Sequence, residues 1–374
     1  MNISAWGRRT LLGYCVTGLL LLKVNAEILK LPPEISAWTW TTDVWSDGGY
    51  QDNLLLSRDA REASPFVRLG TDLGLMRLPL GRFHLSAAVS AEEKRFTAGQ
   101  TVDHERVVSA NTEMSWDLGR FWQSTLNAQY LYQDQVIDAS ITDTHLSSLP
   151  VQGHTFELKP GLRRDISGGW WVEIGVNLMR QSYQQADLDD YWEIGPRAQL
   201  GHRYGRRSEW SLELGVLDRA YDQRETYTVD GNPIGGQALR YRIPSLTFLV
   251  RQFWDEARHW RTLTKLNLER NADNGSGYFS YDRFSLSQQL RYHTRIWELK
   301  GQARVARYQY DLQRADDGLQ ARQKDTLRAL LRVERSLFSG LRIHADYEYE
   351  RALSNREIDG YSVNTFSAGL GWEF

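Results

Sequence analysis

The chain has 374 residues and a nearly balanced charge, with 45 lysines and arginines against 47 aspartates and glutamates. Without a clustered basic face, this balance excludes nucleic acid as an expected partner. The single cysteine, Cys15, lies near the N-terminus, which excludes a disulfide framework or a cysteine metal site in the rest of the chain.

The first 26 residues have the pattern of a cleavable signal peptide. Arg8 and Arg9 precede an apolar run over 11–22, which is too short to cross a bilayer as a helix. Small residues at positions −3 and −1 predict cleavage after Ala26. The mature chain would then begin with a short segment over 27–35.

Beyond residue 35 the chain alternates apolar and polar residues and contains no long apolar run. A period of two predicts β-strands, because successive side chains of a strand point to opposite faces. The first strand is expected over 36–46, with Trp38, Trp40, Thr42 and Val44 on one face. The clearest later segments are 83–92, 170–178, 326–334 and 341–351.

Turn residues divide the alternating region at two kinds of connection. Seven short turns are expected at 78–81, 118–120, 167–169, 205–208, 255–258, 293–295 and 338–340. Eight mostly longer loops are expected at 47–63, 97–105, 135–151, 184–190, 223–237, 273–277, 312–322 and 354–360. None of these loops is expected to fold inward as a large constriction.

Together, these connections predict an all-β fold: one antiparallel, up-and-down, transmembrane β-barrel over 36–374. The count of turns and loops gives about 16 strands, and one misread hairpin would make it 14 or 18. Both termini then lie on the short-turn side.

Aromatic residues gather near both ends of the expected strands, as in the two interfacial girdles of a membrane protein. The alternative is a soluble β-sandwich with an aromatic core. The short-turn girdle would contain Phe121, Trp122, Trp170, Trp171, Trp210, Trp260, Trp297, Trp372 and Phe374. The loop-side girdle would contain Tyr130, Tyr132, Tyr183, Tyr221, Tyr278, Tyr308 and Tyr361.

The last residues, NTFSAGLGWEF, place large apolar side chains on one face and small or polar ones on the other. With this ending, the chain resembles Gram-negative outer-membrane β-barrel proteins of the porin-like and exporter types. The stretch GGYQDN at 48–53 resembles the start of several exporter-type barrels. The resemblance implies that Phe366, Leu370, Trp372 and Phe374 form the signal recognised by the barrel-assembly machinery.

The same resemblance implies export through the signal peptide to the outer membrane, with short turns and 27–35 in the periplasm. Lipids including lipopolysaccharide would surround the barrel, and a homo-oligomer is one possibility. An export role would require a separate periplasmic partner chain, because 27–35 leaves no room for a periplasmic domain.

If the apolar positions face lipid, the alternate positions face the lumen and carry charges of both signs. They could set the solute preference of a water-filled pore, or form cross-strand ion pairs that stiffen a filled barrel. The expected lumen residues are Arg68, Glu113, Lys159, Arg163, Glu173, Arg261, Lys265, Arg304, Arg328, Arg332, Arg342, His344, Asp346 and Glu348.

The expected function is therefore a channel for small polar solutes or the outer-membrane exit of an export system. The alternative is a non-conducting barrel with a structural or surface-interaction role, or a membrane-embedded enzyme. Ser287 and His293 are six residues apart on one strand and cannot form a catalytic pair. No closely spaced histidine pair indicates a metal site, so no catalytic residue, metal or cofactor is expected.

Overall fold

The computed structural model describes residues 37–78, 81–140, 148–185, 188–205, 207–338 and 340–374. The predicted signal peptide, its cleavage site at Ala26 and the segment 27–35 lie outside the described residues. Within the described ranges, no helix is both long and apolar enough to cross a membrane.

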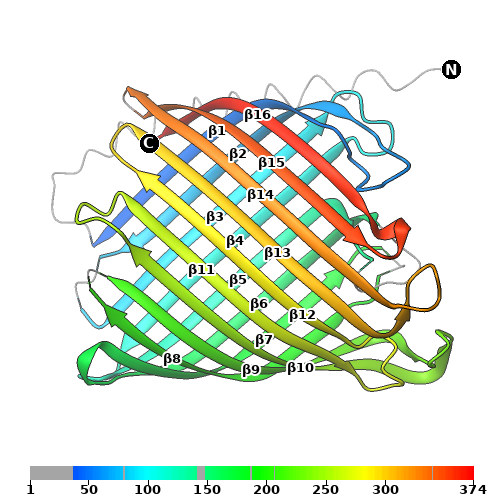
Figure 1. Ribbon diagram of the computed structural model, residues 1–374. Helices are drawn as coiled ribbons and strands as arrows, with labels where there is room; N and C mark the ends of the chain where they lie inside the picture. The colour runs from blue at the N-terminus through cyan, green and yellow to red at the C-terminus, as the bar shows by residue number, and fades with distance from the viewer. Residues whose placement is uncertain (1–36, 79–80, 141–147, 186–187, 206, 339) are drawn as a thin grey trace, which may run out of the picture. The chain divides into compact units, whose positions relative to one another are not determined.

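The structure is a closed antiparallel barrel in which each strand pairs with its neighbours in sequence and β1 pairs with β16 (Figure 1). This confirms the predicted fold class and strand number. The strands are β1 (Trp38–Gln51), β2 (Ser64–Arg77), β3 (Phe83–Phe96), β4 (His104–Asp117), β5 (Trp122–Asp138), β6 (Ser148–Asp165), β7 (Trp170–Tyr183), β8 (Tyr191–Tyr204), β9 (Ser208–Tyr227), β10 (Pro233–Phe253), β11 (Trp260–Asp273), β12 (Tyr281–His293), β13 (Trp297–Arg314), β14 (Ala321–Phe338), β15 (Leu341–Ser354) and β16 (Tyr361–Glu373).

All seven predicted short turns coincide with connections between strands, and 205–208, 293–295 and 338–340 each include one terminal strand residue. Two of the seven turns are tight enough to require glycine. Gly340 has φ +81°, and a Cβ there would lie 2.3 Å from the carbonyl oxygen of Glu373. Gly169 has φ +84°, and a Cβ there would lie 2.5 Å from the carbonyl oxygen of Arg203. The predicted loop 223–237 is wrong in extent, because β9 continues to Tyr227 and β10 begins at Pro233. The loop-end segments 223–227 and 233–237 lack the regular alternation of apolar and polar residues that marks the rest of the barrel.

The inner and outer faces of the barrel are distinguished by contacts that cross it. Lys324 on β14 contacts Asp138 at the end of β5, which is not a neighbouring strand, so the face of Lys324 is the inner one. The opposite face of β14 carries exposed apolar residues such as Leu331. The outward positions of other strands are similar, with Ile174 and Leu214 about 60% exposed (61% and 59%). The barrel is therefore apolar outside and polar inside, as a membrane barrel must be.

Part of the predicted aromatic girdles is wrong. Trp171 faces inward, is buried, and lies over Gly201, where a Cβ would be 2.3 Å from the indole ring. Tyr221, Tyr308 and Tyr361 also face inward and are buried. Adjacent residues of a strand face opposite sides of the sheet, so an aromatic residue that is one position away from a lipid-facing residue faces the lumen.

The first and last strands close the barrel with a continuous register. It runs from Asp43 opposite Glu373 to Gln51 opposite Thr365. The amide of Phe374 also donates a hydrogen bond to the carbonyl oxygen of Thr42 at 2.8 Å. The proposed assembly residues are exposed on the outer face of this closing strand: Phe366, Leu370, Trp372 and Phe374.

Two adjacent positions of β14 offer a test of the assigned faces. Leu331→Lys places a charge on the lipid side, and we expect it to lower the free energy of unfolding by about 2–4 kcal/mol near mid-bilayer. Leu330→Lys is the matched control, because Leu330 faces inward in register with Glu348, and its cost should be small. Denaturant titrations in lipid vesicles measure both, and equal costs would contradict the assignment.

Candidate functional site

The candidate site is the inner wall of the barrel. Register and alternation place every predicted lumen residue on the inward face of its strand. They do not form one site, however. They divide into a buried cluster at the closing seam, a set of ion pairs along the wall, and an exposed group in the middle of the lumen.

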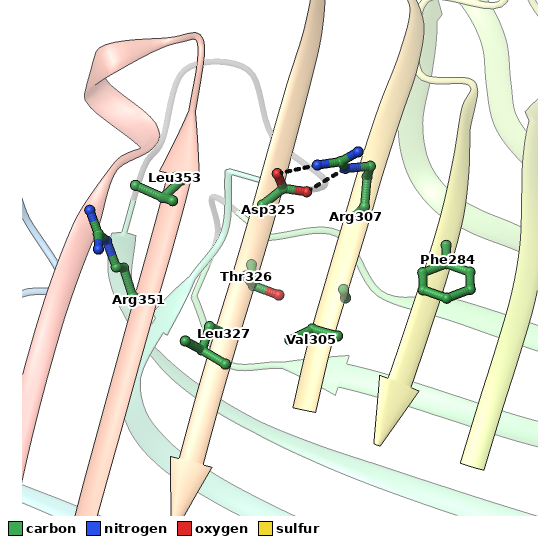
Figure 2. A pocket seen from close by; sticks show the side chains of 9 residues that line it. Phe284, Val305, Arg307, Asp325, Thr326, Leu327, Arg351 and Leu353 are labelled. Atoms are coloured by element: carbon green, nitrogen blue, oxygen red, sulfur yellow. Dashed lines mark hydrogen bonds and ion pairs between the residues drawn. The ribbon is translucent and has the colours of Figure 1, made fainter. Parts of the chain in front are cut away.

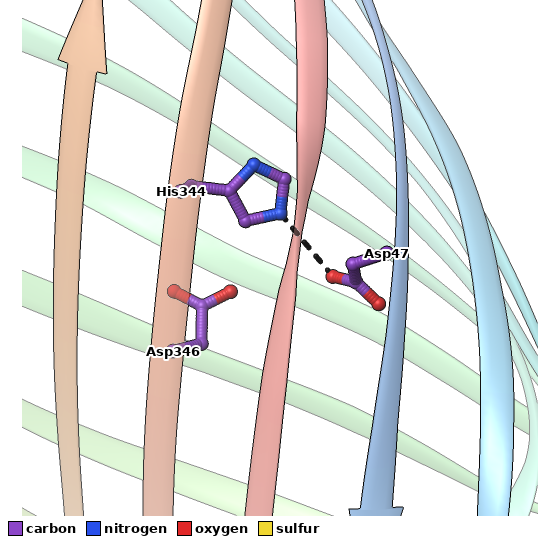
Figure 3. Close-up of side chains that lie close together, drawn as sticks. All are labelled: Asp47, His344 and Asp346. Carbon is purple, nitrogen blue, oxygen red and sulfur yellow. Dashed lines mark hydrogen bonds and ion pairs between the residues drawn. The ribbon is translucent and has the colours of Figure 1, made fainter.

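The seam cluster is centred on Asp47, whose side chain is fully buried. Arg68 on β2 donates to both Asp47 oxygens, from Nε at 3.1 Å and from Nη2 at 2.5 Å. His344 Nε2 lies 3.3 Å from Asp47 Oδ2 (Figure 3). The Ser367 hydroxyl donates to the same oxygen at 3.4 Å. Arg68 Nη2 also contacts Asp346 at 3.3 Å. One buried carboxylate thus joins β1, β2, β15 and β16.

This cluster contains three potential metal ligands, since atoms of Asp47, His344 and Asp346 all lie within 4.8 Å of one another. Arg68 contacts both carboxylates, so the cationic partner that they require is already present. Nor does the cluster activate a nucleophile, because Ser367 donates to Asp47 rather than to His344. Its chemistry is that of a structural ion-pair network.

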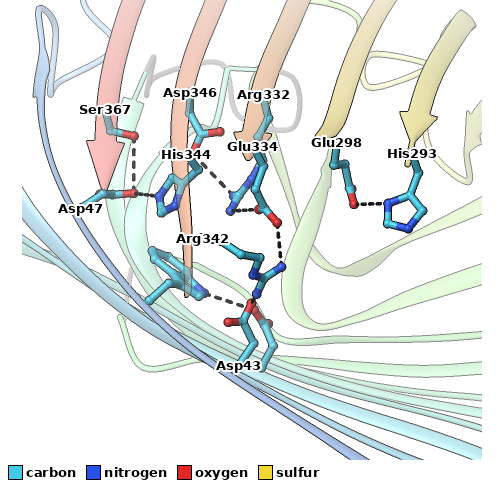
Figure 4. Close-up of polar contacts among 12 residues, drawn as sticks. Asp43, Asp47, His293, Glu298, Arg332, Glu334, Arg342, His344, Asp346 and Ser367 are labelled. Carbon is cyan, nitrogen blue, oxygen red and sulfur yellow. Dashed lines mark hydrogen bonds and ion pairs between the residues drawn. The ribbon is translucent and has the colours of Figure 1, made fainter. Parts of the chain in front are cut away.

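The network continues along the seam (Figure 4). Arg342 forms ion pairs with Asp43 and with Glu334, the latter at 2.7 Å. Arg332 pairs with Glu334 at 3.3 Å and with Asp346 at 3.6 Å. Cross-strand pairs of this kind fix the register of the strands that close the barrel.

The sequence alone missed Asp47 because it was assigned to the loop 47–63, whereas β1 extends to Gln51. The signal was present: Asp43, Trp45 and Asp47 continue the inward alternation of the first strand. A comparable buried pair lies further along the wall, where Arg197 donates to Glu173 at 2.6 Å.

A second buried network crosses the loop end of the lumen, and we call its members Asp138, Ser140, Arg322, Lys324 and Asp359 the mouth bridge. Lys324 Nζ donates to Asp138 at 2.5 Å and also to the Ser140 hydroxyl. Arg322 donates to the Ser140 carbonyl oxygen at 2.6 Å and to Asp359 at 2.9 Å. The side chains of Arg322 and Lys324 are 1% and 0% exposed.

The mouth bridge shows that a loop does enter the lumen, although none was expected to fold inward as a large constriction. The segment directly after β5 reaches across to β14, a strand that is not its neighbour in the sheet. Inward aromatic residues pack beside it, including Tyr310 beneath the Arg322 guanidinium at 4.6 Å. The loop end of the lumen is therefore narrowed by protein.

The middle of the lumen differs, because inward side chains there remain exposed. The exposed inward-facing residues include Glu113, Lys265, Arg304 and Arg328. Lys265, Ser287, Arg304 and Arg328 lie side by side in register on β11–β14. Among the described residues, no carboxylate lies within ion-pair distance of Lys265 or Arg304. Arg328 is paired with Glu348, so Lys265 and Arg304 are the cations of this exposed row that lack an ion pair among the described residues.

Comparisons with known proteins give fold-level likeness only. No protein-family model matches the chain, and no curated protein sequence matches it. Among solved structures, OccAB1 of Acinetobacter baumannii aligns at 10% identity and a TM-score of 0.46, covering 92% of this chain and 98% of that one. A bacterial polysaccharide outer membrane secretin aligns at 13% identity and a TM-score of 0.41, covering 89% and 97%. These values assign neither a substrate nor a partner to this chain.

The mouth bridge predicts strong coupling between Lys324 and Asp138. Lys324→Met should destabilise the barrel by about 3–5 kcal/mol, because it removes the cation paired with the largely buried Asp138 carboxylate. The double variant Lys324→Met, Asp138→Asn should recover much of this loss. Unfolding free energies of the four proteins in a double-mutant cycle measure the coupling.

Lys300→Met is the matched control, since Lys300 also faces inward but has no carboxylate at ion-pair distance among the described residues. Additive effects of the Lys324 and Asp138 substitutions would show that the mouth bridge does not hold in the folded protein.

Proposed function

We propose that this chain is an outer-membrane channel that passes small polar solutes, with a preference for anions. The observation that carries this proposal is the exposure of inward charged residues in mid-lumen, Arg304 and Lys265 above all. A filled barrel would bury these side chains, and burial without a partner would be costly. A water-filled interior is expected for sixteen strands, which enclose more space than side chains alone fill.

The apolar outer face of the barrel supports a location in a membrane. A surface with exposed residues such as Leu69, Ile174, Leu214 and Leu331 would aggregate in water, but it suits the hydrocarbon core of a bilayer. The strands have 13 residues or more, enough to cross a bilayer when tilted. Closed barrels are, besides helices, the structures that cross membranes without leaving backbone groups unsatisfied.

The preference for anions follows from the mid-lumen charges. Lys265 and Arg304 have no carboxylate of the described chain at ion-pair distance, and charged linings set the ion preference of a pore. The role of an outer-membrane exit for an export system remains the broader form of the same proposal, with a separate periplasmic partner.

The second candidate is a non-conducting barrel with a structural or surface role. The mouth bridge favours it, because Arg322 and Lys324 are fully buried where an open channel would leave water. The two candidates differ in one measurable property, which is ion conductance.

Single-channel recording in planar bilayers is therefore the test of function. We expect stepwise conductance and, in a salt gradient, a reversal potential on the anion-selective side. Replacing Lys265 and Arg304 by Gln should shift the reversal potential towards cation selectivity. Arg335→Gln is the control, because Arg335 lies on the outer face of β14 beside Trp297. Silence from folded wild-type protein would favour the non-conducting barrel.

The terminal strand is proposed to serve as the signal for the barrel-assembly machinery. Deleting Phe374 should lower the yield of folded protein in the outer membrane several-fold, while refolding in detergent should change little. Wild-type yield in cells would remove the signal role, and failure in detergent as well would indicate a purely structural role for the bond to Thr42.

A further inference from the structure

The inner wall of the barrel has one strongly basic side, on β11–β13. The register places Lys265, Ser287 and Arg304 next to one another there. Arg261 and Lys300 face inward on the same strands, nearer the short-turn end. Within the described ranges, no carboxylate lies at ion-pair distance from any of these four cations. This side of the lumen is therefore a surface for anions.

The outer face of the same strands shows the pairing that is missing inside. Arg307 on β13 faces outward and donates to both oxygens of Asp325 on β14, at 2.7 Å and 2.8 Å (Figure 2). Arg304 lies three residues earlier on β13 but faces the lumen, where its neighbour on β14 is Arg328. Arg328 is paired with Glu348. Arg304 therefore keeps its guanidinium donors for a solute.

The opposite side of the lumen, on β3–β5, carries a different kind of side chain. In a closed ring of sixteen strands, β4 lies eight strands from β12 in either direction, so these two sides face each other. The inward positions on β3–β5 are rich in neutral groups that donate and accept hydrogen bonds. They include Ser90, Ser109, Asn111, Thr125, Asn127 and Gln129.

Two amides of this neutral side are available to a ligand. Asn111 on β4 and Gln129 on β5 are in register with each other, and both are exposed. In the part of the chain that the structure describes, neither side-chain amide has a hydrogen bond to protein. Glu113, two positions along β4, is also exposed and adds a carboxylate acceptor. Amides and a carboxylate together can bind hydroxyl groups, which both donate and accept hydrogen bonds.

The basic side and the neutral side match in depth. Asn111 and Gln129 lie six and seven residues from the short-turn ends of their strands. Lys265 and Arg304 lie five and seven residues from the short-turn ends of theirs. Because the strands of a closed barrel share one tilt, these residues lie at a similar height in the lumen. A solute at this height has cations on one side and amides on the other.

We propose that the lumen selects acidic oligosaccharides, whose carboxylates contact Lys265 and Arg304 while their hydroxyls contact Asn111 and Gln129. Carboxylates form charge-assisted hydrogen bonds with ammonium and guanidinium groups. An inorganic anion would use the basic side alone, and a neutral sugar would use the amide side alone. This inference names the solute class and rests on the proposed function, because it takes the lumen as the path of the solute.

Isothermal titration calorimetry of the folded protein in detergent, with three matched probes, tests the proposal. Trigalacturonate carries carboxylates and hydroxyls, its methyl ester keeps the hydroxyls without the charge, and triglutamate keeps the carboxylates without the hydroxyls. We expect trigalacturonate to bind about tenfold more tightly than either of the others, since one charge-assisted hydrogen bond is worth about that factor. Equal binding of trigalacturonate and triglutamate would overturn the proposal.

Two double variants test the two sides separately. Asn111→Ala with Gln129→Ala should weaken trigalacturonate binding about fivefold, as expected for the loss of neutral hydrogen bonds, and leave triglutamate binding unchanged. Lys265→Gln with Arg304→Gln should weaken the binding of both anions. Arg307→Gln is the matched control, because its side chain lies on the outer face, and it should change neither. Wild-type affinity of the amide variant for trigalacturonate would also overturn the proposal.

Planar-bilayer recordings with the same probes separate this inference from the proposed function. Trigalacturonate should interrupt the current of the open channel for longer than triglutamate does. A conducting channel that binds all three probes equally would overturn the solute class and leave the channel intact. A silent barrel that still prefers trigalacturonate would overturn the channel and leave the saccharide site intact.

Discussion

A strand in hydrocarbon has no water to satisfy its backbone amides and carbonyls, so every strand of a membrane sheet must have two neighbours. This constraint governs the structure. It requires β1 and β16, the two ends of the sheet, to meet, and their register extends from Asp43 to Gln51. Small residues on β16 permit the close approach: a Cβ at Gly369 would lie 2.1 Å from the carbonyl oxygen of Ser46.

Closure also explains where the buried charge is concentrated. Asp47, Arg68 and His344 come from three strands around the seam and lie in contact although the chain separates the first and last by 297 residues. A buried carboxylate is tolerable only when donors surround it. The correct register supplies these donors, and a slip by one residue would turn them towards lipid. The cluster thus favours one way of closing the barrel over its alternatives.

The sequence predicted most of the barrel because alternation has a direct physical cause. Side chains such as Ile343 and Ala345 face lipid, whereas the alternate His344 and Asp346 face the lumen. The sequence of the strand therefore alternates between apolar and polar residues. Beyond the membrane both faces meet water, so alternation fades and the ends of β9 and β10 were misplaced. Alternation also gives the face of a residue but not its surroundings. It could not show that Arg304 stays exposed while Lys324, on the same face of the wall, is buried.

The contrast between these two cations is the feature of the lumen that sequence reasoning could not reach. Lys324 and Asp138 are 186 residues apart, and only closure of the barrel brings β5 opposite β14. The bridge they form lies at the loop end, where the inner wall is rich in tyrosine, whereas Arg304 lies in mid-lumen among polar side chains. The positively charged residues of the inner wall therefore have two different environments. At the loop end, Arg322 and Lys324 form ion pairs with carboxylates from opposite parts of the wall, whereas in the middle Lys265 and Arg304 have no carboxylate at ion-pair distance among the described residues.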